Sequence, residues 1–197
     1  MATCWNGYRP ICVPNSNADY IYKEARKVLA TYVREDQSDQ EKVKFINDWI
    51  IHFVTYDYEA AETTLDSNEA MKYSAFYLEG VFSIPGFTSQ VAVCDGRSKA
   101  VTLLCAIEGI NSVRVTGEKV KTKEGHAWNR VYVGNNKNKN YQWYVLDTTW
   151  NDVFYNGKYE VSSNKYYLVS DSFHDKDFMV DKTVIPLPNA NTSYARP

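Results

Sequence analysis

The spacing of apolar residues changes its period near residue 110, and no other feature of the chain limits the possible folds as strongly. Upstream, apolar side chains recur every three or four residues within residues 17–34 and again after Ser38. Downstream are three segments rich in Val, Tyr and Trp, namely INSVRVTG (110–117), HAWNRVYV (126–133) and YQWYVLDTTW (141–150). Helical spacing followed by strand-like segments predicts helices first and a sheet second. The short connections between the strands do not allow parallel pairing, so the sequence predicts an α+β fold with an antiparallel meander.

Local signals set the expected bounds of the helices. Ser38 is followed three residues later by a glutamate, which is the signature of a capping box at the start of the second helix. A shorter helix is expected over 67–79, ending at Gly80. A helix of about three turns starts at Cys94 and ends at Gly109, where a left-handed cap is expected.

The composition restricts the class of function. A chain of 197 residues with 44% hydrophobic residues can bury the core of one domain, whereas two domains would be cramped. Its net charge is -2 and its acidic and basic residues are interspersed, so it lacks the basic face that a nucleic-acid backbone requires. No stretch approaches the roughly 18 consecutive apolar residues of a membrane helix, so no membrane span is expected.

The N-terminus and the cysteines say little about the compartment. The segment MATCWNGYRP has no basic region followed by an apolar one, so no secretory signal peptide is expected. This is weak support for the cytoplasm, because a trimmed form of a secreted or cell-surface bacterial protein would look the same. Four cysteines without a C-x-x-C pair are too few for a disulfide scaffold. Cys4 and Cys12 could still close a small loop in an oxidising compartment, and the sequence leaves that disulfide open.

The segments HAWNRVYV and YQWYVLD are expected to pair as a hairpin across GNNKNKN (134–140). With the turn centred near residue 137, His126 and Asp147 fall within one residue of direct opposition. Opposed side chains point to the same face of a sheet, with Cβ atoms roughly 5 Å apart. An imidazole and a carboxylate at that separation can share a hydrogen bond that fixes the tautomer and stabilises the imidazolium.

Cys94 stands at the start of a predicted helix, in the segment VCDGRSKAVTLLCAIEG (93–109). There the unpaired N–H groups and the helix dipole stabilise a thiolate, and a nearby imidazolium lowers the pKa of the thiol further. Each of Cys94, His126 and Asp147 taken alone is more simply a structural residue. Together they supply the nucleophile, base and orienting group of thiol acyl transfer, so we identify them as candidate catalytic residues.

Other residues receive plainer interpretations. Cys105, about three turns further along the same helix, is expected to be an inert packing residue. His52 and His174 have no partner visible in the sequence and are expected to be structural or exposed. Trp128 and Trp150 lie beside the candidate catalytic residues, where they could wall a cleft or pack in the core.

Three blocks of the sequence together resemble the transglutaminase-like superfamily: AVCDGRSKAVTLLCAIEGI (92–110), GHAWNRVYV (125–133) and WYVLDTTWND (143–152). WIIHFVTYDY (49–58) and KYYLVSDSFHDKDF (165–178) look like flanking pieces of bacterial members. The resemblance implies a papain-like α+β core, in which N-terminal helices and the nucleophile-bearing helix pack on an antiparallel sheet. It also implies one transglutaminase-like domain over 1–197, with a core at about 38–178, an N-terminal helical extension at 1–37 and a peripheral tail at 179–197.

By this resemblance Cys94 is the nucleophile, His126 the base and acid, and Asp147 the orienting residue. Many members have a glycine two residues before the nucleophile, where this chain has Ala92, so the approach to the thiol is expected to be shaped differently. The expected oxyanion donors are the Cys94 backbone N–H and the Gln90 side chain.

The residues and the resemblance together predict cysteine-dependent acyl transfer on protein or peptide amides through a thioester at Cys94. Attack by an amine would make the chain a transglutaminase, and attack by water would make it a deamidase or a cysteine protease. The alternative is a catalytically silent module that uses the same fold to bind polypeptide. Zinc lacks a fourth ligand beside Cys94, His126 and Asp147, and no calcium loop is visible, so no metal or cofactor is expected. The oligomeric state is not predicted.

Overall fold

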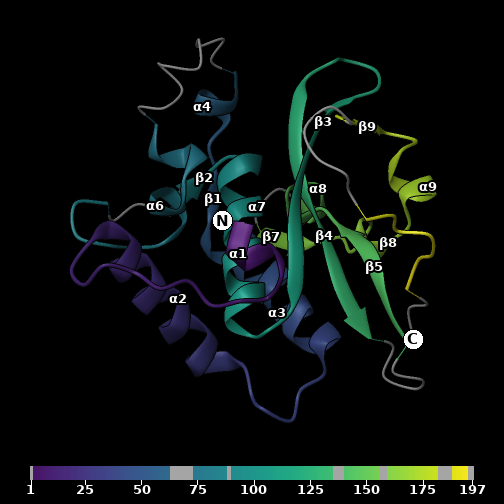
Figure 1. The fold of residues 1–197 in the computed structure, drawn as a ribbon. Helices are drawn as coiled ribbons and strands as arrows, with labels where there is room; N and C mark the ends of the chain where they lie inside the picture. Colours follow the sequence, from purple (N-terminus) through teal and green to yellow (C-terminus); the bar gives the residue numbers. More distant parts are fainter. Residues whose placement is uncertain are drawn as a thin grey trace.

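The computed structural model describes residues 2–62, 73–87, 90–134, 140–155, 159–181 and 188–194. A central helix, α7, lies between other helices on one side and a curled antiparallel sheet on the other (Figure 1). The helices are α1 (Ala2–Trp5), α2 (Asn17–Tyr32), α3 (Asp39–Phe53), α4 (Tyr58–Glu62), the 3-10 turn η1 (Ser74–Phe76), α6 (Leu78–Val81), α7 (Cys94–Ile107), α8 (Thr148–Asn151) and α9 (Asp171–His174). The strands are β1 (Thr55–Tyr56), β2 (Val91–Ala92), β3 (Asn111–Lys119), β4 (Gly125–Gly134), β5 (Tyr141–Leu146), β6 (Asp152–Tyr155), β7 (Tyr159–Ser162), β8 (Tyr167–Val169) and β9 (Phe178–Val180).

Helices α2 and α3 form where the amphipathic spacing predicts them. Ser16 caps α2 by accepting the Asp19 N–H at 3.3 Å, and Ser38 caps α3 with the complete capping box. The apolar stripes of both helices face inward, and their buried members include Ile21, Ala25, Leu29, Val43, Ile46 and Ile50. Both predictions are therefore confirmed. No helix in the described ranges is long and apolar enough to span a bilayer.

Helix α7 is the centre of the fold and is buried on nearly every face. Helices α2 and α3 cover one side of it, and β3 and β4 cover the other (Figure 1). A helix covered all round needs no polar face, which explains why the run from Ala100 to Ile107 carries no charge. The helix ends as predicted: Gly109 has φ +76°, and the Ile110 N–H donates to the Cys105 carbonyl at 2.9 Å.

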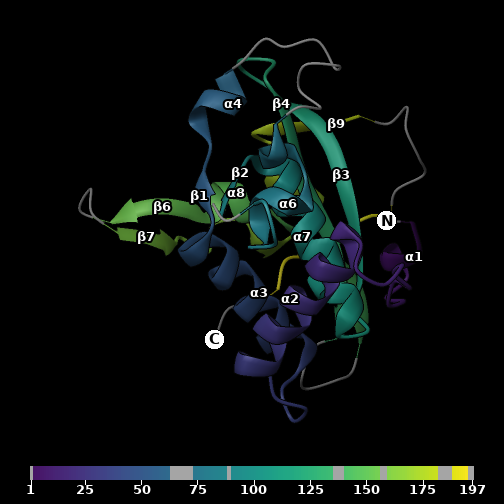
Figure 2. The same ribbon diagram turned by 90° about the vertical axis from the view of Figure 1, so that its left-hand side faces the viewer.

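The five-stranded sheet is antiparallel throughout, in the order β8-β5-β4-β3-β9. Strand β4 pairs with β3 on one side and with β5 on the other, from Asn129↔Leu146 to Gly134↔Tyr141. The predicted α+β class with an antiparallel meander is therefore confirmed. Strands β6 and β7 form a separate hairpin that projects away from the other elements (Figure 2).

The third predicted strand is shorter than the sequence suggested. Strand β5 ends at Leu146, and the residues that follow form the short helix α8. Asp147 caps this helix, because its Oδ1 accepts the Trp150 N–H at 3.0 Å. An aspartate side chain that bonds the backbone ahead of it favours a helix start over a continued strand.

The helix predicted over 67–79 lies partly outside the described residues, and its described part differs from the prediction. Residues 73–81 contain η1 and α6, and Gly80 lies inside α6 instead of ending a helix. A Cβ at Gly80 would lie 2.6 Å from the carbonyl oxygens of both Ser74 and Val91. Close backbone packing, and not helix termination, therefore requires this glycine.

The described part of the C-terminal tail packs on the sheet, contrary to the predicted peripheral extension. Arg130 Nη1 donates to the Pro188 carbonyl at 2.6 Å, and the Tyr194 N–H donates to the Leu168 carbonyl at 2.8 Å. Ala190 is buried in an apolar cluster. A segment without periodicity can be held in this way, because backbone hydrogen bonds need no side-chain pattern.

A buried cation joins the start of α7 to its surroundings. Arg97 lies three residues after Cys94 and is 0% exposed. Its Nη1 is 2.7 Å from Asp152 Oδ2, and its Nη2 donates to the Val54 carbonyl at 2.5 Å. Its guanidinium lies over the Tyr56 ring, 5.3 Å from the ring centroid. A buried cation needs such partners, so Arg97 fixes α7 relative to the segments around β1 and β6.

Arg97→Met is expected to lower the free energy of unfolding by about 3 kcal/mol, because it leaves the mostly buried Asp152 without a cation. The same substitution at Arg34, whose ion pair with Asp36 is exposed, should leave the free energy nearly unchanged. Urea unfolding followed by circular dichroism measures both effects. Equal losses for the two variants would contradict the role assigned to Arg97.

Candidate active site

Cys94 is the first residue of α7 and is half-buried. Cys94 interacts with the His126 imidazole and with the Tyr56 hydroxyl, and its charge is among the causes that raise the pKa of both groups. Val93, which precedes the helix, provides no side-chain cap. The Cys94 side chain therefore lies at the positive end of the helix dipole, in a first turn that also contains Asp95.

His126 and Asp147 are hydrogen-bonded, with His126 Nε2 2.7 Å from Asp147 Oδ2, and both side chains are buried. The contact does not arise from direct opposition in the hairpin, which the sequence led us to expect. The β4–β5 ladder ends at the pair Asn129↔Leu146, and His126 is instead opposite Gly117 of β3. Asp147 reaches the imidazole diagonally, from the N-cap of α8. The predicted proximity was correct, and the predicted register was wrong.

The charges of this pair follow from their burial and from each other. Burial alone would lower the pKa of His126, but the charge and hydrogen bond of Asp147, together with Cys94, raise it to about 10. Burial alone would raise the pKa of Asp147, yet His126 and His174 hold it below its usual range. Near neutral pH these shifts favour a carboxylate beside an imidazolium. Because the pKa of His126 is raised in the folded chain, its stabilising contribution is complete below pH ~6.5 and is lost as the pH rises through about 10.

Aromatic rings enclose the imidazole. Trp128 stacks on His126 with ring centroids 5.6 Å apart, Phe178 lies at 4.9 Å, and Trp150 meets the imidazole edge-on at 6.5 Å. Trp128 is 1% exposed, whereas Trp150 is 39% exposed. The sequence left the two tryptophans open between cleft wall and core. Trp128 is a core residue beside the imidazole, and Trp150 is its partly exposed neighbour.

A family model described as the transglutaminase-like superfamily matches residues 26–148, which is more than half of the chain. The chain belongs to the transglutaminase-like superfamily. This confirms the membership that the three sequence blocks predicted. Membership suggests cysteine-based catalysis in general terms, without naming a reaction.

Two curated relatives and one solved structure are similar to this chain. The kyphoscoliosis peptidase of Mus musculus is 25% identical over 158 residues, which cover 75% of this chain and 21% of that protein. The kyphoscoliosis peptidase of Homo sapiens is 23% identical over 158 residues, with the same coverage of 75% and 21%. The crystal structure of a TGase matches 70% of this chain and 35% of its own, with 25% identity and a TM-score of 0.44. The chain spans about a fifth of the length of the curated relatives it matches.

In this transglutaminase-like chain, the asparagine of the HAWN segment joins the sheet to the central helix. Asn129 Nδ2 donates to the Ser98 carbonyl and to Thr102 Oγ1, both at 3.0 Å, and Asn129 is 1% exposed. One buried amide on β4 thus bonds two residues of α7. These bonds fix how the helix that begins at Cys94 sits against the strand that carries His126.

Tyr56 is a site residue that the sequence analysis missed. Strands β1 and β2 form a two-residue parallel pair in which Tyr56 is opposite Ala92, and this places the Tyr56 hydroxyl beside Cys94. Burial raises the pKa of Tyr56, and charge on Cys94 raises it further, so the hydroxyl stays protonated. A strand of two residues shows no period, and the available signal was only the family-like segment in which Tyr56 occurs.

The Gln90 side chain, expected to be an oxyanion donor, is directed elsewhere. Its Nε2 donates to the Val81 carbonyl at the end of α6, at 3.2 Å. The Gln90 carbonyl accepts the Thr55 N–H at 2.9 Å, which helps to hold β1 beside β2. Gln90 therefore supports the strand pair that positions Tyr56.

His174 was expected to be structural or exposed, with no partner, and the second part of this expectation was wrong. It is 0% exposed, and its Nε2 lies 3.3 Å from Asp147 Oδ2. The residue ends the four-residue helix α9, which is too short to show a period in the sequence. His52, by contrast, is exposed.

Cys105, the second cysteine of α7, is a packing residue as expected. It is 0% exposed, and burial raises its pKa to about 12. It therefore remains a neutral thiol, unlike a residue that serves as a nucleophile. Within the described parts of the chain, no three His, Cys, Asp or Glu side chains form a group that could hold a metal ion.

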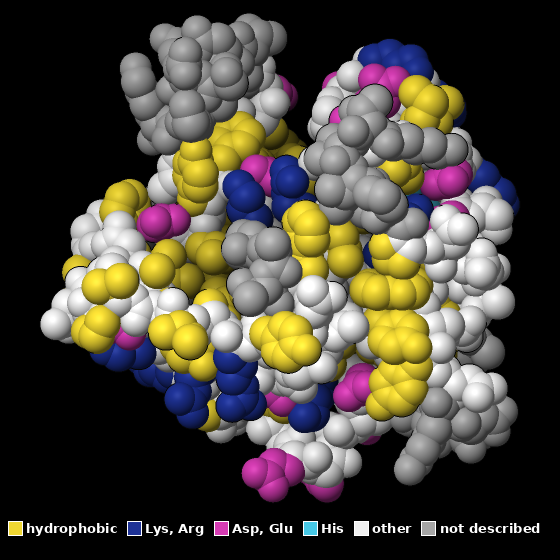
Figure 3. Space-filling view, viewed as in Figure 1, with side chains coloured by type: hydrophobic (Ala, Val, Ile, Leu, Met, Phe, Trp, Pro, Cys, Tyr) yellow, Lys and Arg dark blue, Asp and Glu magenta, His cyan; other side chains and the backbone are white. Residues whose placement is uncertain are grey.

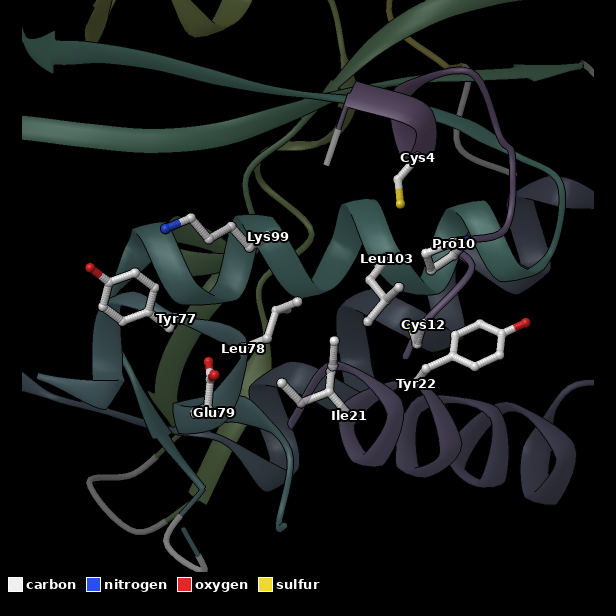
Figure 4. A pocket seen from close by; sticks show the side chains of 11 residues that line it. Cys4, Pro10, Cys12, Ile21, Tyr22, Tyr77, Leu78, Glu79, Lys99 and Leu103 are labelled. Carbon is white, nitrogen blue, oxygen red and sulfur yellow. The ribbon is translucent and has the colours of Figure 1, made fainter. Parts of the chain in front are cut away.

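A mostly apolar cavity of about 470 Å³ lies along α7, and the candidate catalytic residues do not line it. Its walls come from α1, α2, α6 and α7, and include Ile21, Leu78 and Leu103 (Figure 4). Figure 3 shows hydrophobic side chains around a hollow on the face that carries α2 and α6. Cys4 and Cys12 both line the cavity and are free thiols, so the disulfide that the sequence left open is not formed in this structure.

Asp147→Asn should lower the pKa of His126 from about 10 towards the ordinary value of ~6.5, since an amide carries no charge to hold the imidazolium. The chain has three histidines, so an NMR titration of 15N-histidine-labelled protein can follow each of them. Asp36→Asn, at an exposed position, is the matched control and should leave the His126 titration unchanged. A pKa that stays near 10 in the Asp147 variant would contradict the pairing.

Proposed function

We propose that this chain catalyses cysteine-dependent acyl transfer on protein or peptide amides. Cys94 is the nucleophile, His126 the acid and base, and Asp147 the orienting residue. The observation that carries the proposal is the 2.7 Å hydrogen bond between Asp147 and His126, together with the interaction of His126 with Cys94 at the start of a helix. It joins the three groups that thiol acyl transfer needs. The partner that this chemistry requires is a protein or peptide substrate.

The reaction proceeds in two steps. In the first, the Cys94 thiolate attacks the carbonyl carbon of a carboxamide or peptide bond and forms a tetrahedral oxyanion. The His126 imidazolium then gives its proton to the leaving nitrogen, so that ammonia or an amine departs and a thioester remains on Cys94. In the second step, the neutral imidazole takes a proton from an incoming amine or water, which attacks the thioester. The acyl group leaves on the new nucleophile, and the thiolate–imidazolium pair is restored.

Two donors beside Cys94 are suited to stabilise the oxyanion, namely the Cys94 backbone N–H and the Tyr56 hydroxyl. In the free chain the Tyr56 hydroxyl interacts with Cys94. Because its raised pKa keeps it protonated, this hydroxyl can turn from Cys94 to the oxyanion when a substrate carbonyl enters. The Arg97 guanidinium over the ring and the β1–β2 pair hold Tyr56 in position.

The acyl acceptor distinguishes three reactions within this chemistry. An amine acceptor gives cross-linking, whereas water gives either deamidation of a glutamine or hydrolysis of a peptide bond. The curated relatives are named peptidases, which favours hydrolysis, although this chain corresponds to only about a fifth of their length. Intact-mass spectrometry after incubation with a glutamine-rich protein and an amine probe separates the outcomes. Cross-linking raises the mass of the substrate by that of the amine minus ammonia. Deamidation raises it by the small difference between a carboxyl group and the amide that it replaces. Proteolysis splits the substrate into fragments.

Iodoacetamide is expected to alkylate Cys94 at least about tenfold faster than Cys12 at about pH 5.5, because only Cys94 has an imidazolium beside its sulfur. Both side chains are half-buried, and burial raises the pKa of Cys12. Mass spectrometry of the peptides after brief labelling compares the two thiols in the same molecule. Equal and slow labelling would overturn the assignment of Cys94 and would favour a catalytically silent module that binds polypeptide.

Tyr56→Phe should lower kcat about a hundredfold with little change in KM, because the lost donor acts on the transition state. Tyr58→Phe is the matched control: the two rings pack with centroids 5.0 Å apart, but Tyr58 is 61% exposed. Steady-state kinetics on the substrate found by mass spectrometry measures both variants. A large rise in KM at unchanged kcat would instead assign Tyr56 to substrate binding.

A further inference from the structure

Asp147 is contacted by a second histidine, which the proposed reaction does not use. His174 Nε2 lies 3.3 Å from Asp147 Oδ2, the same carboxylate oxygen that His126 Nε2 meets at 2.7 Å. The other carboxylate oxygen, Oδ1, accepts the Trp150 N–H at 3.0 Å. Two imidazoles therefore share one oxygen of a carboxylate that is 0% exposed.

The His174 ring is held in place by aromatic packing. Phe178 stacks on it at 4.5 Å with an interplanar angle of 20°, Trp128 lies at 4.7 Å and Tyr166 at 5.4 Å. The ring is 0% exposed, and among the described residues its Nδ1 has no hydrogen-bond partner. Within the described part of the chain, the ring thus has its hydrogen bond at Nε2, with Asp147.

The direction of this hydrogen bond follows from the acceptor. An ionised carboxylate can only accept, so Nε2 of His174 must carry the proton. An imidazolium would place a second N–H on Nδ1, where no acceptor lies among the described residues and where burial penalises an unpaired donor. The geometry therefore requires the Nε2–H tautomer of His174.

Because Oδ2 of Asp147 accepts a second hydrogen bond, from His174, its hydrogen bond with His126 is altered. Each hydrogen bond to a carboxylate withdraws part of its negative charge, and in a buried site this effect is damped less than it is at the surface. The proton that His126 holds towards Asp147 is therefore bound less tightly than it would be by a carboxylate without His174. A general acid works best when it does not hold its proton too tightly at the working pH.

We propose that His174 is a positioning residue for the proposed acyl transfer, which acts through Asp147 by dividing the charge of one carboxylate oxygen between two imidazoles. The inference rests on the proposed function for its catalytic meaning, although its electrostatic content is independent of any substrate. It assigns to His174 two effects: the carboxylate stays ionised while buried, and the His126 imidazolium can still release its proton to the leaving nitrogen.

The other described titratable groups near His126 and Asp147 do not take the positioning role that we assign to His174. Cys94 interacts with His126, and its charge is among the causes that raise the pKa of His126. The Tyr166 hydroxyl donates to Asp177 Oδ2 at 2.5 Å, and burial and Asp177 raise the pKa of Tyr166, so it remains neutral. Lys119 lies over the ring of Trp150, with its Nζ 4.6 Å from the centroid.

The tautomer of His174 can be tested in the unaltered protein. Long-range 1H–15N NMR spectra of 15N-histidine-labelled chain identify which ring nitrogen carries the proton, and His52→Gln and His126→Gln assign the three signals. We expect a proton on His174 Nε2 and none on Nδ1 near neutral pH. A proton on Nδ1 alone would overturn the proposal without any substitution at His174.

Two substitutions of His174 separate its hydrogen bond from its packing. His174→Phe keeps a ring between Phe178 and Trp128 but removes the donor, whereas His174→Gln keeps an amide donor near the position of Nε2. The measured quantity is the pH window in which Cys94 is a thiolate while His126 is an imidazolium. Its acid limit is the pH at which Cys94 begins to alkylate rapidly, and its alkaline limit is the NMR titration of His126.

In His174→Phe we expect the alkaline limit to rise by about one pH unit, because the undivided carboxylate holds the imidazolium more strongly. The acid limit should stay in place, because His126 is an imidazolium both before and after Cys94 ionises, so the window becomes wider. His174→Gln should restore the unaltered window. An unmoved alkaline limit, a narrower window, or equal behaviour of the two variants would each overturn the proposal, whatever happens to the melting temperature. Failure of Cys94 to alkylate in the unaltered chain would refute the proposed function instead, and the His126 titration would still decide the role of His174.

Discussion

Burial of the Asp147 carboxylate is the constraint on which the arrangement of the candidate site depends. Because the carboxylate is 0% exposed, its charge must be met by donors within the protein. These come from three elements: His126 on β4, the Trp150 N–H in α8 and His174 at the end of α9. Loss of any one of them would leave part of a buried charge unpaired. The strand and both short helices are therefore confined to one arrangement around this side chain.

Helix α7 provides the other half of the site, and buried polar contacts again set its position. Asn129 bonds α7 to β4, Arg97 bonds it to the segment before β1, and the β1–β2 pair brings Tyr56 to Cys94. Apolar packing alone tolerates small shifts, whereas hydrogen bonds weaken steeply when their atoms move by about half an ångström. The apolar core thus stabilises the fold, and these few polar groups fix where the thiol lies relative to the imidazole.

The helices and strands with a regular buried face were predictable from the sequence, because burial of one face imposes a period on the residues that form it. This applies to α2, α3, α7 and the strands β3 to β5. Counting along the hairpin also placed His126 near Asp147, although Asp147 belongs to a helix cap and not to the strand. Tyr56 and His174 escaped the same reasoning, because they lie on a two-residue strand and a four-residue helix. Their positions depend on packing partners that are distant in sequence, such as Arg97 for Tyr56 and Trp128 for His174, and no spacing along the chain records these contacts.

We propose that acyl transfer proceeds through a thioester on Cys94. This thioester can be trapped by acid quenching during turnover of a glutamine-containing peptide and located by peptide mapping with mass spectrometry. We expect the Cys94 peptide to carry the donor peptide without its leaving group, which is ammonia for a glutamine side chain and the C-terminal fragment for a cleaved peptide bond. Hydroxylamine should remove this adduct. Turnover that continues in a Cys94→Ala variant, or an adduct found on Cys12 in place of Cys94, would contradict this proposal.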